Sequence, residues 1–153
     1  KDLMHHFSIP GMKVLLFAFG EDNPKHPYLP HNFSNNCVVY TGTHDTNTAR
    51  GWLETEASPA DRHRLYQYIE KEVTAESVSW DLIHLALESI ADLVIIPMQD
   101  ILGLDVQGRM NRPSVAQGNW GWRLTPEQLS PDTFRRLAEE TRIYGRANQV
   151  IAT

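Results

Sequence analysis

Cysteine is nearly absent from this sequence, and it contains no long apolar run. Its 153 residues include a single cysteine, Cys37, so an internal disulfide is excluded and nothing indicates an oxidising compartment. No apolar stretch approaches the roughly 18 residues of a transmembrane helix, so no membrane partner is expected. The first six residues, KDLMHH, lack the apolar region of a signal peptide and an initiator methionine. We therefore expect the chain to begin inside a longer gene product.

Positive charge is also scarce. The chain has 14 Lys and Arg against 19 Asp and Glu, a net charge of −5 and a pI near 5.8. A nucleic-acid-binding face needs an excess of basic residues, so nucleic acid is not an expected partner. No Cys and His spacing typical of zinc sites occurs, so no metal is expected. Hydrophobic residues make up 41% of the chain, which is enough for a packed core in one ordinary domain.

Three short apolar runs predict buried strands, at residues 14–19, 38–40 and 93–96. Continuous apolar runs, rather than alternating ones, are typical of parallel strands covered on both faces. Three such strands leave both sheet edges open, so the sequence is typical of the end of a larger β/α architecture. In β/α barrels the chemistry lies at the carboxyl ends of the strands. Polar clusters follow the three runs there, at residues 20–24, 41–45 and 97–100.

Helical patterns fill most of the remaining chain. Ser58, followed by Pro59 and by Asp61 three positions after the serine, predicts a helix start, and apolar residues then recur at helical spacing up to residue 73. A second apolar stripe with a 3.6-residue period covers residues 80–91, and a last helix is expected to begin near Ser130. Residues 103–122 form the longest irregular stretch, and a loop of that length in a compact domain is usually functional or disordered.

The segment VVYTGTHDTNT, residues 38–48, is the most informative for chemistry. A buried strand delivers His44 and Asp45 to its carboxyl end, after a glycine that permits a tight turn. The carboxylate there can accept hydrogen bonds from vicinal sugar hydroxyls, act as a base or bind a metal, and the imidazole can donate a further hydrogen bond. From spacing alone the signal is weak, since His-Asp pairs occur by chance in many proteins, and a capping aspartate beside a surface histidine is the more frequent explanation.

Several further motifs occur in one order with that segment. They are IPGMKVL at 9–15, NP at 23–24, YLPHN at 28–32, TGTHD at 41–45, IPMQD at 96–100, RMN at 109–111 and GNWGWRL at 118–124. In order and spacing they resemble the amylomaltase family of 4-alpha-glucanotransferases, glycoside hydrolase family 77, and the resemblance covers nearly the whole chain. It implies that residues 1–153 are the C-terminal segment of a catalytic (β/α)₈ barrel. The segment would hold strands six to eight with their helices and no separate second domain.

The resemblance also implies the activity and the roles of two residues. The family transfers α-1,4-glucan segments between maltooligosaccharides by a retaining mechanism without a cofactor. Asp45 matches the third catalytic carboxylate, which holds sugar hydroxyls and stabilises the transition state, and His44 matches the histidine that bonds the same sugar. The nucleophilic Asp and the acid/base Glu of the family follow earlier strands, before residue 1. The remainder of the barrel and glucan substrates are therefore the expected partners, in the cytoplasm or, alternatively, in the plastid stroma.

Other substrate-binding residues are predicted with a structural alternative for each. Asn111 matches a family asparagine near the sugar and Phe17 a family aromatic beside the active site; the alternatives are loop stabilisation and barrel core. Asn119 and Trp120 lie in the loop after the last strand, where Trp120 is either a sugar platform or a buried anchor. Gln99 and Asp100, at the end of that strand, are expected to brace the site through hydrogen bonds rather than to touch substrate.

The sequence departs from the family pattern in two places. Thr46 and Asn47 stand where the family commonly has Asn and Asp, and Ser114 replaces a usual glycine. Two other hypotheses stay open. One is a non-catalytic glucan-binding fragment or barrel remnant, and the other is a metal-dependent phosphohydrolase using His44 and Asp45, which would need further ligands on surrounding helices.

Overall fold

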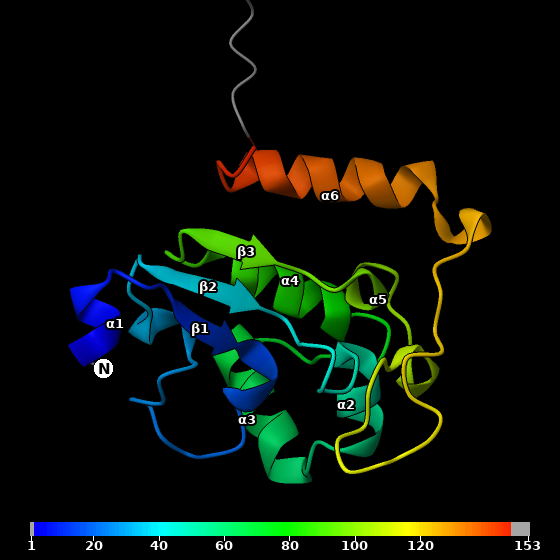
Figure 1. The fold of residues 1–153 in the computed structure, drawn as a ribbon, viewed down its shortest axis with the longest axis horizontal. Helices are drawn as coiled ribbons and strands as arrows, with labels where there is room; N and C mark the ends of the chain where they lie inside the picture. The colour runs from blue at the N-terminus through cyan, green and yellow to red at the C-terminus, as the bar shows by residue number, and fades with distance from the viewer. Residues whose placement is uncertain (1, 148–153) are drawn as a thin grey trace, which may run out of the picture.

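A three-stranded parallel sheet organises the chain in the computed structural model, which describes residues 2–147. The strands are β1 (Gly11–Val14), β2 (Cys37–Tyr40) and β3 (Leu93–Ile95), in that spatial order. Val39 of β2 pairs with Lys13 on one side and Val94 on the other. Figure 1 shows the three strands side by side, all pointing toward the loops that follow them. The prediction of neighbouring parallel strands is confirmed.

The first strand lies earlier in the chain than its apolar run predicts. Residues 14–19 were expected to be extended, but β1 ends at Val14 and Leu15–Phe17 form a 3₁₀ helix, η1. Leu15 and Phe19 are fully buried, so the run does mark the core. The backbone turns because the Ala18 N–H bonds to the Leu15 oxygen at 2.9 Å instead of continuing the ladder. A continuous apolar run reports burial, which extended and turned backbone can share.

The predicted long helices are present. Helix α3 (Pro59–Ile69) begins after Ser58, whose hydroxyl accepts from the Asp61 N–H at 3.2 Å while Asp61 accepts from the Ser58 N–H at 2.8 Å. Helix α6 (Pro131–Ile143) begins after Ser130, whose hydroxyl accepts from the Asp132 N–H at 3.2 Å. Helix α4 (Val78–Glu88) ends before the apolar stripe at residues 80–91 does, and residues 90–91 lie in the loop that leads to β3.

Three α-helices were not predicted: α1 (Asp2–His6), α2 (Ala49–Thr55) and α5 (Met98–Ile101). Helix α2 matters most for the site because it directly follows the segment that carries Asp45. Its N-cap is Thr48, whose hydroxyl accepts from the Gly51 N–H at 2.9 Å. Gly51 lowers the helix propensity, but a Cβ there would lie 2.3 Å from the Asn47 Oδ1, so close packing requires the glycine.

Short 3₁₀ helices complete the chain: η2 (Pro30–Asn32), η3 (Val106–Gly108) and η4 (Pro126–Gln128). Only η3 interrupts residues 103–122, which are otherwise irregular as expected. None of the helices within residues 2–147 combines the length and the apolar character that a membrane span requires.

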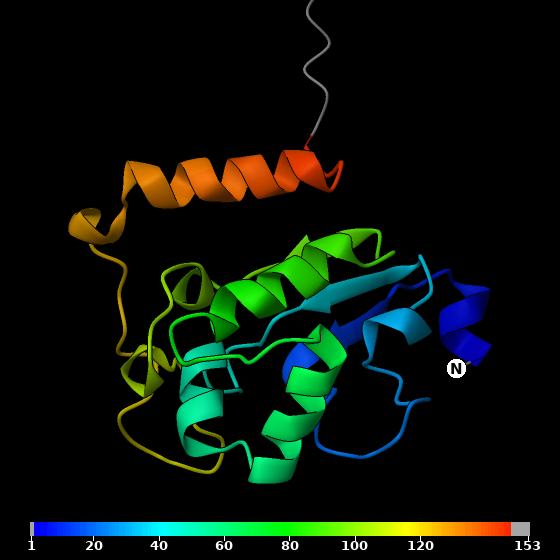
Figure 2. The same ribbon diagram turned by 180° about the vertical axis from the view of Figure 1, so that it is seen from behind.

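The core lies mainly between the sheet and helices α2, α3 and α4, which cover one face (Figure 2). A second, smaller cluster joins α4 to α6, where the Arg136 guanidinium lies 3.8 Å from the centre of the Trp80 ring. Arg146, just beyond α6, donates to the carbonyl oxygens of Leu87, Ser89 and Ala91 at 2.6–2.9 Å. Helices α2, α3 and α4 thus support the sheet from one side, and the loops after the strands gather at one end of it.

Candidate active site

A tight turn at the carboxyl end of β2 presents Asp45 to solvent. Thr46 organises the turn: its hydroxyl accepts from the Thr43 N–H at 2.9 Å and donates to the Thr43 carbonyl oxygen at 3.0 Å. Gly42 is needed at the start, because a Cβ there would lie 2.7 Å from the Thr46 hydroxyl oxygen. With the backbone held in this way, the Asp45 side chain stays 51% exposed.

Asn111 and His44 are the side chains that orient the Asp45 carboxylate. The Asn111 amide donates to Oδ1 at 2.6 Å, and the His44 Nε2 lies 3.3 Å from Oδ2. The backbone joins the same two segments, because the Asn111 N–H donates to the His44 oxygen at 3.0 Å. The fold therefore brings together three of the predicted site residues, although Asn111 lies 66 positions from Asp45 in the chain.

A cavity of about 580 Å³ lies beside this cluster and includes Asp45 and Phe17 in its lining. Phe17 is 51% exposed, so it is not part of the core of the described residues, and its ring centre lies 5.9 Å from that of Tyr28. Aromatic and apolar walls combined with a few placed polar groups are the composition of small-molecule sites. The arrangement can stack on the apolar face of a sugar ring while the carboxylate accepts from its hydroxyls.

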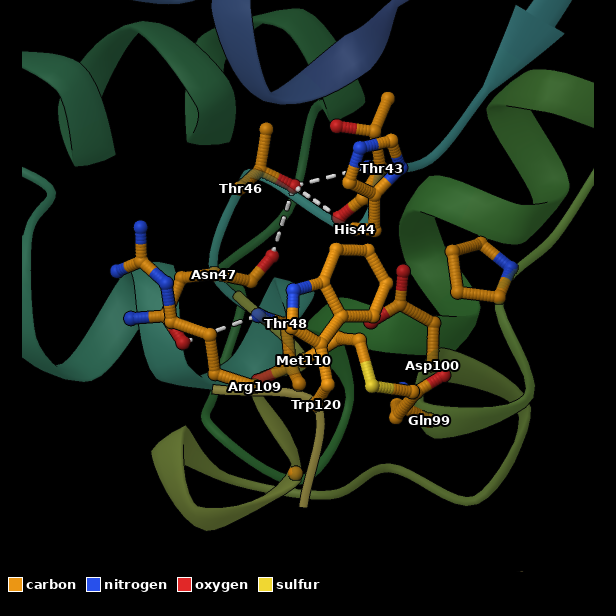
Figure 3. Close-up of a pocket in the computed structure, with 12 residues that line it drawn as sticks. Thr43, His44, Thr46, Asn47, Thr48, Gln99, Asp100, Arg109, Met110 and Trp120 are labelled. Carbon is orange, nitrogen blue, oxygen red and sulfur yellow. Dashed lines mark hydrogen bonds between the residues drawn. The ribbon is translucent and has the colours of Figure 1, made fainter. Parts of the chain in front are cut away.

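Trp120 borders a second cavity, of about 210 Å³, which His44 also lines (Figure 3). The two rings are 5.3 Å apart between centres, with an angle of 34° between their planes. The main-chain N–H of Trp120 donates to the Met110 main-chain oxygen at 2.7 Å, and the residue is 53% exposed. Its ring face is thus available next to His44, as a sugar platform would require, rather than enclosed by the described residues.

Asn119 lies apart from these cavities. Its Oδ1 accepts from the Arg112 N–H at 2.9 Å, and its Nδ2 donates to the Val115 oxygen at 2.8 Å. The side chain therefore braces its own loop, and it is absent from the residues that line either cavity.

The polar cluster at residues 20–24 is also displaced from the predicted position. Because β1 ends at Val14, this cluster does not follow the strand directly. Four of its residues, 21–24, line a separate cavity of about 340 Å³ together with Arg64 and Tyr68. The prediction that this cluster directly follows a strand is therefore wrong.

Asp100 braces the end of the sheet, as expected for that position. The side chain is 1% exposed; Oδ2 accepts from the Thr41 hydroxyl at 2.5 Å and Oδ1 from the Ala49 N–H at 2.8 Å. The carboxyl group therefore joins the end of β2 to the start of α2. Burial raises its pKa above the ordinary value of 3.8, although the hydrogen bonds from Ala49 and Thr41 oppose this rise.

This raised pKa predicts a pH-dependent stability. The folded chain keeps the Asp100 proton to higher pH than the unfolded chain, so the stability that this group contributes falls as pH rises from 3.8 through the folded pKa. Asp100→Asn stays neutral and can still accept from Ala49 while donating to Thr41. In the complete enzyme the melting temperature of this variant should therefore rise relative to that of the wild type as the pH increases across that interval. A constant difference in melting temperature between pH 4 and pH 8 would contradict the assignment.

Two contributors to the site were not identified from the sequence, Arg109 and Glu56. The Arg109 Nη2 donates to the main-chain oxygen of Asp45 at 3.1 Å, and its Nη1 donates to the Glu56 Oε1 at 2.7 Å. Arg109 belongs to the RMN motif, so a signal existed. Glu56 is the C-cap residue that follows the unpredicted helix α2, and no motif marks it. Within residues 2–147, His, Cys, Asp and Glu side chains form no group of three or more that could hold a metal ion.

Known proteins resemble this chain both in sequence and in structure. A profile of the family described as 4-alpha-glucanotransferase matches residues 1–130. A 4-alpha-glucanotransferase of Synechocystis is 49% identical over 145 residues, which cover 94% of this chain and 28% of the relative. The potato relative, named as chloroplastic/amyloplastic, is 45% identical over 141 residues, which cover 90% of this chain and 24% of the relative.

Two solved structures share the fold. An amylomaltase from Streptococcus agalactiae, in complex with acarbose, superposes with a TM-score of 0.89 at 30% identity, covering 96% of this chain and 29% of that one. An amylomaltase from Corynebacterium glutamicum superposes with a TM-score of 0.68 at 14% identity, covering 92% of this chain and 26% of that one. This match supports the fold alone. The chain spans between about a quarter and three tenths of the length of these relatives. Since the family profile matches residues 1–130 of 153, the chain belongs to the 4-alpha-glucanotransferase family of glycoside hydrolase family 77.

Proposed function

We propose that residues 1–153 are the C-terminal segment of the catalytic (β/α)₈ barrel of a 4-alpha-glucanotransferase, with no separate second domain. In this proposal β1, β2 and β3 are barrel strands six, seven and eight. Two features support it: the strands are parallel neighbours in chain order, and the polar side chains gather at their carboxyl ends, where barrel enzymes place their chemistry. The remainder of the barrel would then cover the open edges of β1 and β3.

The proposed reaction is transfer of α-1,4-glucan segments between maltooligosaccharides with retention of configuration. An upstream carboxylate attacks the anomeric carbon while an upstream carboxylic acid protonates the departing glycosidic oxygen, which leaves a covalent glycosyl-enzyme. The hydroxyl of an acceptor sugar then attacks that intermediate and loses its proton to the same acid/base residue. Both groups precede residue 1. Carboxylates and oriented hydrogen bonds suffice for these steps, so neither a metal nor an organic cofactor is required.

The position of the Asp45 carboxylate is the observation that carries the proposal. It projects from the carboxyl end of β2 into an aromatic-lined cavity and is oriented by Asn111 and His44. Its Oδ1 accepts a hydrogen bond from the Asn111 amide, and the half-exposed carboxylate keeps further lone pairs free for sugar hydroxyls. We assign it the binding of the glucosyl ring and the stabilisation of the positively charged transition state.

The other proposed substrate contacts surround that carboxylate. His44 donates to the same sugar, and Asn111 orients Asp45 and reaches the sugar hydroxyls. Phe17 lines the same cavity as Asp45 and Trp120 the same cavity as His44, and both rings are about half exposed. Asn119 contributes less directly, because its amide holds the loop that presents Trp120. We place the enzyme in the cytoplasm, with the plastid as the alternative suggested by the potato relative.

Incubation of the complete enzyme with maltotriose tests this function. Disproportionation should give glucose together with maltooligosaccharides longer than the substrate, because sugar hydroxyls rather than water accept the glycosyl group. Chromatography of the products separates transfer from hydrolysis. Products no longer than maltotriose would contradict the transferase assignment, and inversion at the anomeric carbon would contradict the retaining mechanism.

A further inference from the structure

Arg109 connects the two segments that carry Asp45 and Asn111. Its Nη2 donates to the main-chain oxygen of Asp45 at 3.1 Å, and its Nε donates to the main-chain oxygen of Asn111 at 2.9 Å. The side chains of these same two residues meet in the 2.6 Å hydrogen bond that orients the Asp45 carboxylate. A planar guanidinium with several fixed donors is suited to setting such a distance between two backbones.

Glu56 determines where that guanidinium can lie. Its Oε1 accepts from the Arg109 Nη1 at 2.7 Å and from the Asn47 Nδ2 at 3.0 Å. Asn47 is buried, and its own Oδ1 accepts from the Thr48 N–H at 3.0 Å. The backbone of Glu56 is fixed as well, since its N–H caps α2 by donating to the Trp52 oxygen at 2.9 Å. Glu56 is therefore held at its main chain and at its carboxylate.

We infer that Glu56 is a positioning residue for the glycosyl-transfer reaction, acting through Arg109. This inference rests on the proposed role of Asp45. Glu56 holds the Arg109 guanidinium against the main chain of Asp45 and Asn111, and so preserves the geometry of the side-chain hydrogen bond between them. Its own role is distinct from that of the three active-site carboxylates.

Charge gives Glu56 a second effect on Asp45. The Arg109 Nη2 already lies at the Asp45 main chain, so a small rotation would bring the guanidinium toward the Asp45 carboxylate. Paired charges of this kind form the strongest hydrogen bonds. Without Glu56, Arg109 would occupy lone pairs that the sugar hydroxyls need. Since those hydroxyl contacts strengthen in the transition state, their loss should appear in kcat more than in KM.

The test is Glu56→Ala in the complete enzyme, assayed by maltotriose disproportionation. We expect kcat to fall between about 10- and 100-fold, the range that a misplacement of about 1 Å produces, with little change in KM. The Glu56 side chain is 41% exposed, and ion pairs of such exposure contribute little to stability, so the variant should fold. Glu54→Ala is the matched control: it removes the 2.9 Å pair with Arg50 from the same helix, away from the cavity, and should keep the wild-type kcat.

A double-mutant cycle with Arg109→Ala decides whether Glu56 acts through that arginine. If it does, adding Glu56→Ala to Arg109→Ala should cause no further loss of kcat. A wild-type kcat in Glu56→Ala, or two losses that multiply in the double variant, would overturn the inference. Asp45→Asn separates this failure from a wider one. If Asp45→Asn abolishes transfer while Glu56→Ala does not weaken it, only the role of Glu56 fails; near-normal transfer in Asp45→Asn removes the proposed role on which the inference rests.

Discussion

Asp45→Asn in the complete enzyme is expected to lower kcat for maltotriose disproportionation by about 10³-fold or more, roughly 4 kcal/mol of transition-state stabilisation. The substitution keeps the size of the side chain and an oxygen that can accept from Asn111, so the 2.6 Å contact can persist. It removes the negative charge to which we assign the stabilisation of the positive character that develops on the glucosyl ring in the transition state. KM should change less than kcat, because charge develops only after the substrate has bound.

Asp132→Asn provides the control for that measurement. Asp132 is a largely exposed carboxylate at the start of α6, paired with Arg135 at 2.8 Å and remote from both cavities. Its neutralisation changes the net charge of the chain by the same amount and should leave kcat unchanged. Unchanged melting temperatures in both variants would show that the comparison is made on folded enzyme. Near-normal transfer by Asp45→Asn would remove Asp45 from the catalytic set.

The architecture could be predicted where burial and local chemistry agree. The apolar runs at residues 38–40 and 93–96 coincide with β2 and β3 to within one residue at either end, because polar turns follow both runs and end the strands. Ser58 and Ser130 mark helix starts because a serine hydroxyl can accept from the backbone N–H groups of the first turn. Residues 14–19 were misplaced because burial alone does not distinguish a strand from a 3₁₀ turn packed in the same core.

Helix α2 shows a different limit. Its seven residues contain a glycine, and it buries Ala49, Trp52 and Leu53 against the core. A short helix of this kind owes its stability to tertiary packing rather than to propensity, so its sequence carries little periodic signal. Missing α2 meant missing Glu56, which follows its last residue. The error in secondary structure therefore became an error in the site.

The site itself was predicted as a set of residues rather than as a geometry. The motif pattern identified Asp45, His44 and Asn111, and the structure places them in mutual contact. The pattern could not indicate that Asn119 turns its amide into its own loop, because a side-chain rotamer depends on which backbone groups are unpaired nearby. The binding and catalytic roles of Asp45, His44 and Asn111 stay predictions, and the Asp45→Asn substitution described above tests the first of them.

Residues 1–153, expressed alone, are expected to release no measurable glucose from maltotriose. A retaining mechanism needs two carboxyl groups about 5–5.5 Å apart, one nucleophilic and one that exchanges a proton. The cavity beside Asp45 is lined by one further carboxylate, Glu56, and its Oε1 already accepts from Arg109 and Asn47. Asp100 is buried with both oxygens bonded. No described carboxylate is therefore placed to complete the pair.

The same preparation separates loss of turnover from loss of the sugar cleft. Phe17, Trp120 and Asp45 are all at least half exposed, so weak binding of acarbose or of a maltooligosaccharide can persist without reaction. Calorimetric titration that finds binding, with glucose release no greater than in a protein-free blank, would favour a glucan-binding fragment as the description of the isolated segment. Glucose release above that blank, from a sample free of the complete enzyme by intact mass, would mean that these residues hold a full set of reacting groups, and the upstream placement of nucleophile and acid/base would be wrong.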